Sequence, residues 1–182
     1  DQIITQTLES DIPQYASLSV ATGRKLRRLM SIVAQSVPFK PDYSSIANAI
    51  GVSRNVVPDY FLYMEPAGMI GQLRDETGGL RSLGKVEKIY LDNTNIMYVL
   101  GADSANTGNL RETFFYNQTR VVSDVISSKT SDFVIGEHTF EGGGKKKGVK
   151  QIEDVPNGHL VKDDIEYGHG ISIPLWTFGL LY

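Results

Sequence analysis

A chain of 182 residues with 41% hydrophobic and 21% charged residues has an ordinary globular composition, sufficient for one domain or two small ones. It contains no cysteine, which excludes disulfides, thiolate metal ligands and cysteine nucleophiles and suits a cytoplasmic protein. No run reaches the roughly 20 apolar residues that a membrane-spanning helix needs, so we expect no membrane partner. The net charge of −3 argues against indiscriminate binding to polyanions.

The first residues predict the end of a helix. The chain opens with Asp rather than Met, and Ile3, Ile4 and Leu8 have the spacing of an apolar helix face. We therefore expect this chain to be a fragment of a longer protein.

A helix-turn-helix is predicted in the next part of the chain. An amphipathic helix over Thr22–Val37 comes first. Ser44 can then cap a short second helix, Gly51 supplies the turn, and Ser53 can cap a third helix. Pro58 lies about five positions into that third helix, where it would remove a backbone hydrogen bond.

A β-hairpin is predicted to follow these helices. Met69–Arg74 and Val86–Asp92 have the composition of strands, and the residues DETGG at Asp75–Gly79 predict a turn after the first strand. Three helices and a hairpin together give a winged helix, so we expect a linker helix and a winged helix-turn-helix over residues 1–84, followed without a flexible linker by a second domain.

Residues 85–182 predict a domain of α/β or α+β class, built from a small mixed sheet with flanking helices. The expected elements are a helix at Leu110–Ile126, strands at Phe133–Ile135, Thr139–Glu141 and His159–Lys162, and a final strand and short helix at Ile171–Tyr182 that bury Trp176 and Phe178.

Two carboxylates are predicted to face each other across a hairpin in the second domain. If Gly136–Glu137 form a two-residue turn, Asp132 falls opposite Glu141, with Cβ atoms roughly 5 Å apart. Such a pair can share Mg²⁺, and Glu112 in the preceding helix could supply a third ligand. The alternative is that these are ordinary acidic residues at the ends of edge strands.

Basic residues provide two candidate contacts for nucleic acid. Arg54 and Asn55 begin the third helix, where base edges are met, and the preceding helix carries Arg24, Lys25, Arg27 and Arg28, which could contact phosphates. Residues 1–84 are electrically neutral, however, so a structural spacer or a protein contact is an equal alternative. The second candidate is GGGKKKG at Gly142–Gly148, which is either a phosphate-approaching loop or a solvated turn and is not a Walker A motif.

The segments IANAIGVSRNVVPDYFLYMEPAGMIGQLRD, KVEKIYLDNTNIMYVL, GNLRETFFYNQTR and SDFVIGEHTFEGGGKKKG resemble, in this order, the C-terminal region of a bacterial AAA+ ATPase family. In that family an ATPase core precedes a winged helix and an uncharacterised domain similar to restriction endonucleases of the PD-(D/E)xK type. The resemblance implies that ATP is bound only by a core missing from this chain.

The same resemblance implies a nuclease-like site made of Glu112, Asp132 and Glu141. The pattern places a lysine two residues after the second acid, where this chain has Gly143, and Lys145 lies about 6–7 Å further along an extended strand. The resemblance thus implies a degenerate site with weak or absent cleavage. The function we expect is a partner-binding or regulatory portion of an AAA+ ATPase that contacts nucleic acid or protein. The alternatives are a Mg²⁺-dependent nuclease, a DNA-binding winged-helix regulator and a protein-interaction scaffold.

Overall fold

The computed structural model describes residues 1–76, 84–101 and 106–181 and has a mixed α/β fold with two sheets. It divides into two compact units, Asp1–Gln72 with Lys88–Ala105 and Leu73–Glu87 with Asn106–Tyr182. Both hairpin strands pass from one unit to the other, whereas the sequence predicts a single division at residues 84 and 85. The predicted turn after the first strand lies partly outside the described residues.

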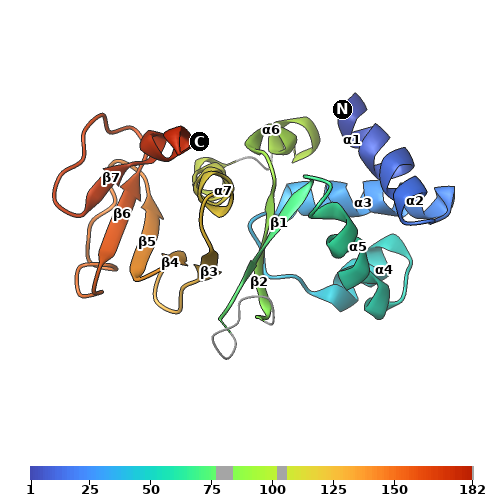
Figure 1. Cartoon of the computed structure of the whole chain (residues 1–182), viewed down its shortest axis with the longest axis horizontal. Coiled ribbons are helices and arrows are strands. Elements are labelled where there is room, and N and C mark those ends of the chain that lie inside the picture. Colours follow the sequence, from blue (N-terminus) through green and yellow to red (C-terminus); the bar gives the residue numbers. More distant parts are fainter. Residues whose placement is uncertain (77–83, 102–105, 182) are drawn as a thin grey trace. The chain divides into compact units, whose positions relative to one another are not determined.

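The first unit begins with a nearly continuous helix made of α1 (Gln2–Gln6), a π-helical turn and α2 (Ile12–Tyr15). Ile4, Leu8 and Ile12 are buried. The predicted apolar face is therefore confirmed for Ile4 and Leu8, but Ile3 is 78% exposed, so its predicted place on that face is wrong. This helix packs on α3 (Val20–Ser36), whose first turn is capped by the Ser19 hydroxyl (Figure 1).

The segment for which a helix-turn-helix is predicted contains α4 (Tyr43–Ile50) and α5 (Val57–Met64). Asp42 caps α4 in place of the predicted Ser44, because its carboxylate accepts the backbone N–H groups of residues 44 and 45. Gly51 ends α4 in the left-handed conformation with φ of 69°, as the predicted turn requires.

The predicted third helix is interrupted at its start. Arg54–Val56 form a 3-10 turn, and α5 begins only at Val57. Pro58 therefore occupies the first turn of α5, where its missing N–H has no intrahelical partner to lose. The expectation that Pro58 disrupts a helix interior is wrong for this reason.

The hairpin consists of β1 (Ile70–Arg74) and β2 (Val86–Leu91), close to the predicted bounds. Ile89 also exchanges two backbone hydrogen bonds with Phe39, in the connection between α3 and α4. A short helix, α6 (Thr94–Ile96), and a π-helical turn follow β2.

The second unit is a five-stranded mixed sheet with α7 (Thr107–Arg120) packed on β3 and β5 (Figure 1). Its strands lie in chain order, β3 to β5 antiparallel and β5 to β7 parallel, with these bounds: β3 Val125–Ser127, β4 Phe133–Ile135, β5 His138–Gly143, β6 Gly158–Lys162 and β7 Ser172–Pro174. The predicted helix to Ile126 is too long, since Val125 and Ile126 belong to β3 and Val121 and Val122 are exposed.

The hairpin between β4 and β5 has the predicted register. Ile135 pairs with His138 and Phe133 with Phe140, around a turn at Gly136, whose φ is 58°. A 3-10 segment, Leu175–Leu180, follows β7. Phe178 in this segment packs edge-on against Phe115, 4.7 Å between ring centroids, but Trp176 is 53% exposed, so its predicted burial is wrong.

Gly23 sets how closely α3 approaches the first helix. A Cβ atom at residue 23 would lie 2.9 Å from Glu9 Cα and 3.1 Å from Glu9 O, both backbone atoms. Gly23→Ala should therefore lower the free energy of unfolding by about 1–2 kcal/mol, because overpacking outweighs the gain in helix propensity. Urea unfolding followed by circular dichroism measures this.

Gly148→Ala is the control, since a Cβ atom at residue 148 meets nothing within 4 Å. It should change stability by less than about 0.5 kcal/mol. Equal midpoints for the two variants would mean that the two helices do not pack at Gly23.

Candidate functional site

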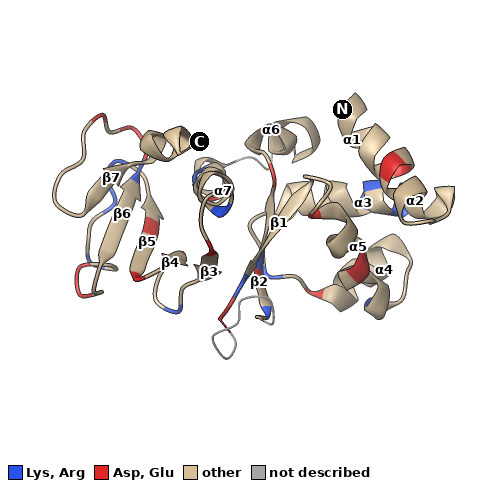
Figure 2. Ribbon diagram, in the orientation of Figure 1, with Lys and Arg blue, Asp and Glu red and all other residues tan. Residues whose placement is uncertain are grey.

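The basic residues of α3 divide into two kinds. Arg27 donates to the Asp1 carboxylate at 2.5 Å, and the Lys25 ammonium donates to the carbonyl of Gly51 at 2.9 Å. Both side chains therefore serve contacts within the first unit. Arg24 and Arg28 are exposed and have no such use among the contacts just described. Figure 2 marks the Lys and Arg positions along the ribbon of α3 in blue.

Arg54 and Asn55 are exposed in the 3-10 turn that precedes α5, and not on the helix itself. The charge of Arg54 is among the causes that hold the pKa of Asp42 below its usual range, after the hydrogen bonds that Asp42 accepts from Ser45 and Ser44. Arg54 thus stands near a fixed negative charge, which reduces the positive potential it presents to a polyanion.

Glu141 on β5 is a deeply buried charged group of the second unit, with 3% of its surface exposed. Its carboxylate accepts hydrogen bonds from the Ser131 hydroxyl at 2.6 Å and the Gln151 amide at 3.1 Å, and it forms an ion pair with Lys147. A buried carboxylate is costly unless it is paired and hydrogen-bonded, and here all three partners are in place.

Lys147 reaches Glu141 by folding back over Gly143. A Cβ atom at residue 143 would lie 2.7 Å from Lys147 Cβ and 2.9 Å from Lys147 Cγ, so the lysine stem fills the space that a side chain of residue 143 would occupy. The ammonium group also donates to the carbonyl of Gly142 at 2.9 Å. The predicted substitute lysine, Lys145, is exposed, and Lys147 takes that place because a turn at Gly144–Lys147 reverses the chain.

The three predicted carboxylates do not gather at one point. Asp132 accepts a hydrogen bond from the backbone N–H of Gly142 at 2.9 Å, and a Cβ atom at Gly142 would lie 3.4 Å from Asp132 Oδ2 and 3.9 Å from Glu112 Cγ. Asp132 and Glu112 therefore meet over Gly142, whereas Glu141, the preceding residue of β5, points to the other face.

The predicted facing of Asp132 and Glu141 is corrected in the same way. Strand pairing stops at Phe133, the Ser131 hydroxyl donates to the Glu141 carboxylate, and the Asp132 carboxylate accepts from the backbone N–H of Gly142. Within residues 1–76, 84–101 and 106–181, no group of three or more His, Cys, Asp or Glu side chains could hold a metal ion.

A second ion pair lies at the same end of the sheet. Arg111 on α7 donates to the Asp163 carboxylate at 2.7 Å from Nε and 2.6 Å from its terminal nitrogen, and both side chains are largely buried. Asp163 follows β6, and its backbone N–H donates to the carbonyl of Gly143. The carboxyl ends of parallel strands β5 and β6 thus carry the polar cluster, which we define as Arg111, Glu112, Ser131, Asp132, Glu141, Lys147, Gln151 and Asp163.

Sequence reasoning missed Arg111, Ser131, Gln151 and Asp163, and it included Lys147 only as one of the lysines of GGGKKKG. The one available signal was positional, because Asp163 directly follows a predicted strand and Arg111 adjoins Glu112. The pairing of Lys147 with Glu141 depends on the turn between them, which no motif encodes.

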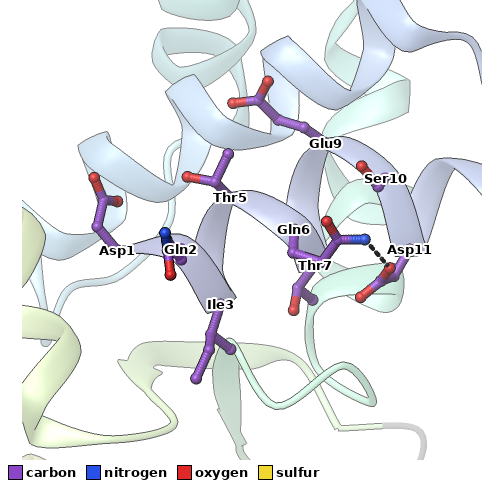
Figure 3. A pocket seen from close by; sticks show the side chains of 9 residues that line it. All are labelled: Asp1, Gln2, Ile3, Thr5, Gln6, Thr7, Glu9, Ser10 and Asp11. Carbon is purple, nitrogen blue, oxygen red and sulfur yellow. Dashed lines mark hydrogen bonds between the residues drawn. The ribbon is translucent and has the colours of Figure 1, made fainter.

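The first unit also has a hollow of about 800 Å³ along its first helix, lined by residues between Asp1 and Asp11 (Figure 3). Its lining contains three carboxylates and no basic residue, and the Gln6 amide donates to Asp11 at 2.9 Å. The hollow is open, and the basic residues of α3 are not among the residues that line it.

Lys147→Ala should lower the free energy of unfolding by about 2–3 kcal/mol at pH 7, because it leaves the buried Glu141 carboxylate without its counter-charge. Thermal and urea unfolding measure the change. Lys146→Ala removes an exposed neighbouring lysine and should be nearly neutral.

Adding Glu141→Gln to Lys147→Ala removes the unpaired charge and should restore part of the lost stability. If the double variant is no more stable than Lys147→Ala, Lys147 does not stabilise the protein through its ion pair with Glu141.

Comparison with known proteins places the first unit in a family. The model described as "Domain of unknown function (DUF8612)" matches residues 1–106. No curated protein and no solved structure matches the chain. The part of the chain that the structure describes contains no helix long and apolar enough to cross a membrane. Because the model matches more than half of the 182 residues, the chain belongs to the DUF8612 family, a domain of unknown function.

Proposed function

We propose that this chain is the C-terminal, partner-contacting portion of a cytoplasmic AAA+ ATPase, and that its first unit is a winged helix that contacts nucleic acid. The observation that carries the proposal is the exposure of Arg24, Arg28 and Arg54, while their neighbours Lys25 and Arg27 are used within the unit. The AAA+ part of the proposal rests on the four sequence segments that resemble the C-terminal region of that ATPase family. The ATPase core of the same protein would then be the second partner.

The charges limit how strong such a contact is. Three exposed arginines neutralise about three phosphates, so log K should fall with log salt concentration with a slope of about −3. Asp42 lies near Arg54 and reduces its effect. Contacts of this kind hold a protein on the nucleic-acid backbone and carry little sequence information.

We expect weak, salt-dependent binding of duplex DNA that decreases when the exposed arginines are removed. Fluorescence anisotropy with a labelled duplex at 50 and 200 mM salt measures it. Arg24→Ala, Arg28→Ala and Arg54→Ala should each reduce the salt slope by about 1, and Lys146→Ala, an exposed lysine of the second unit, is the charge-matched control. Nanomolar affinity that hardly changes with salt would contradict a binding surface made of these three arginines. No binding at 50 mM salt would favour a protein partner or a scaffold.

A second candidate function is Mg²⁺-dependent cleavage of nucleic acid by the second unit. It is favoured by Lys147, whose stem fills the space over Gly143 where the nuclease pattern places a lysine. Two contacts oppose it, since the Glu141 carboxylate is committed to Lys147 and the Asp132 carboxylate to the N–H of Gly142. The carboxylates that the resemblance implies as metal ligands are therefore already engaged in other contacts.

We expect little or no nicking of supercoiled plasmid in the presence of Mg²⁺. Asp132→Asn and Glu141→Gln, purified in the same way, provide the background caused by contaminating nucleases. Strong cleavage lost in both variants would make the nuclease the leading function. Strong cleavage that survives Asp132→Asn would place the chemistry elsewhere in the chain.

A further inference from the structure

Two histidines from adjacent parallel strands meet at the other end of β5. His138 is the first residue of β5 and His159 the second residue of β6. His138 Nδ1 lies 2.8 Å from His159 Nε2, which is a hydrogen bond between two imidazoles. The register pairs Phe140 with His159, so both histidines lie on the same face as Phe140.

The ring positions are supported by packing. Phe140 stacks on His159 with 5.2 Å between ring centroids, and it lies 6.4 Å from the ring of His138. Phe140 is itself held by Phe115 of α7 at 5.3 Å. The His159 ring is thus placed by an aromatic cluster, while His138 remains open to solvent.

His159 is suited to remain uncharged at neutral pH. Burial, and then the positive charge of a protonated His138, lower the pKa of His159 below its usual value. Two protonated rings at 2.8 Å would also repel each other. Neutral imidazole is the form that binds transition metals, and it is the commonest ligand for them.

The kind of metal follows from the ligand type. The 2.8 Å between the nitrogens is a hydrogen-bond distance, and two ligands at about 2.0–2.1 Å from one ion have their nitrogens about 2.9–3.3 Å apart, so a small turn of one ring brings both nitrogens to an ion. Among divalent first-row metals, imidazole sites bind Ni²⁺ and Cu²⁺ more tightly than Mn²⁺, Fe²⁺ or Co²⁺. We propose that His138 and His159 form a two-histidine site for a divalent transition metal, Ni²⁺ or Cu²⁺, with water completing the shell.

Loading this site changes the tautomer of one ring. The ring that now donates the hydrogen bond releases that proton and takes one up at its other nitrogen, so both rings stay neutral, and the exposed His138 ring turns until both lone pairs point to one ion. Exposure of His138 allows this turn. Binding should therefore weaken as the pH falls and the imidazoles protonate.

Isothermal titration of the purified chain with Ni²⁺ tests the site. We expect one ion per chain at pH 7.5 and at least about tenfold weaker binding at pH 5.5. His138→Asn and His159→Asn should each weaken binding at least about tenfold, since each removes one of two protein ligands. His169→Asn is the matched control, because His169 is the remaining histidine of the chain and belongs to a different strand connection.

Two results would overturn the site. One is the absence of stoichiometric Ni²⁺ binding in the wild-type chain. The other is binding that His138→Asn and His159→Asn leave unchanged or that His169→Asn reduces as much as they do. Circular dichroism of each variant shows whether it is folded, and chemical-shift changes of the His138 and His159 ring protons in the wild-type chain give a measurement that does not depend on variants.

Discussion

The stability of the second unit depends on a counter-charge for one carboxylate, Glu141, which is buried in its sheet. Glu141 is almost completely buried at the point where β5 continues past β4, and an unpaired charge there would cost several kcal/mol. Lys147 provides the counter-charge only because Gly143 has no side chain, so the glycines of this segment serve packing as well as turns. The same interaction fixes the return of the chain after β5, which in turn places Gln151 against the carboxylate.

This arrangement explains how a resemblance to a nuclease and the absence of a gathered carboxylate set can coexist in one chain. The residues that the pattern would use are present, but their partners are supplied from within the protein. Asp132 is bound by a backbone N–H and Glu141 by an ammonium group. A site whose acidic groups are already satisfied gains less from binding a cation, since the cation must first displace those contacts. These internal contacts therefore disfavour the binding of a cation by Asp132 and Glu141.

The sequence predicted elements whose signals are local. The apolar spacing of α3, the left-handed turn at Gly51 and the hairpin around Gly136 depend on neighbouring residues, and all three are confirmed. Prediction was less successful where two neighbouring residues compete for one place. Asp42 displaces Ser44 as a cap because its carboxylate can accept two N–H groups, and Lys147 displaces Lys145 because a turn reverses the chain. The exposure of Trp176 likewise depends on tertiary packing, which apolar character alone does not determine.

Strand β5 carries both the histidine pair and the buried ion pair of Glu141 with Lys147, and it holds the two apart. His138 and Gly143 are at its opposite ends, about 16 Å apart at about 3.3 Å per residue. That distance exceeds the Debye length of about 8 Å at physiological ionic strength. The side chains of His138 and Phe140 also lie on the opposite face from Glu141, because alternate residues of a strand point to opposite faces. A metal ion on the histidine pair would therefore leave the Lys147 ion pair intact, so metal binding and the stability of the buried carboxylate can be measured independently in one protein.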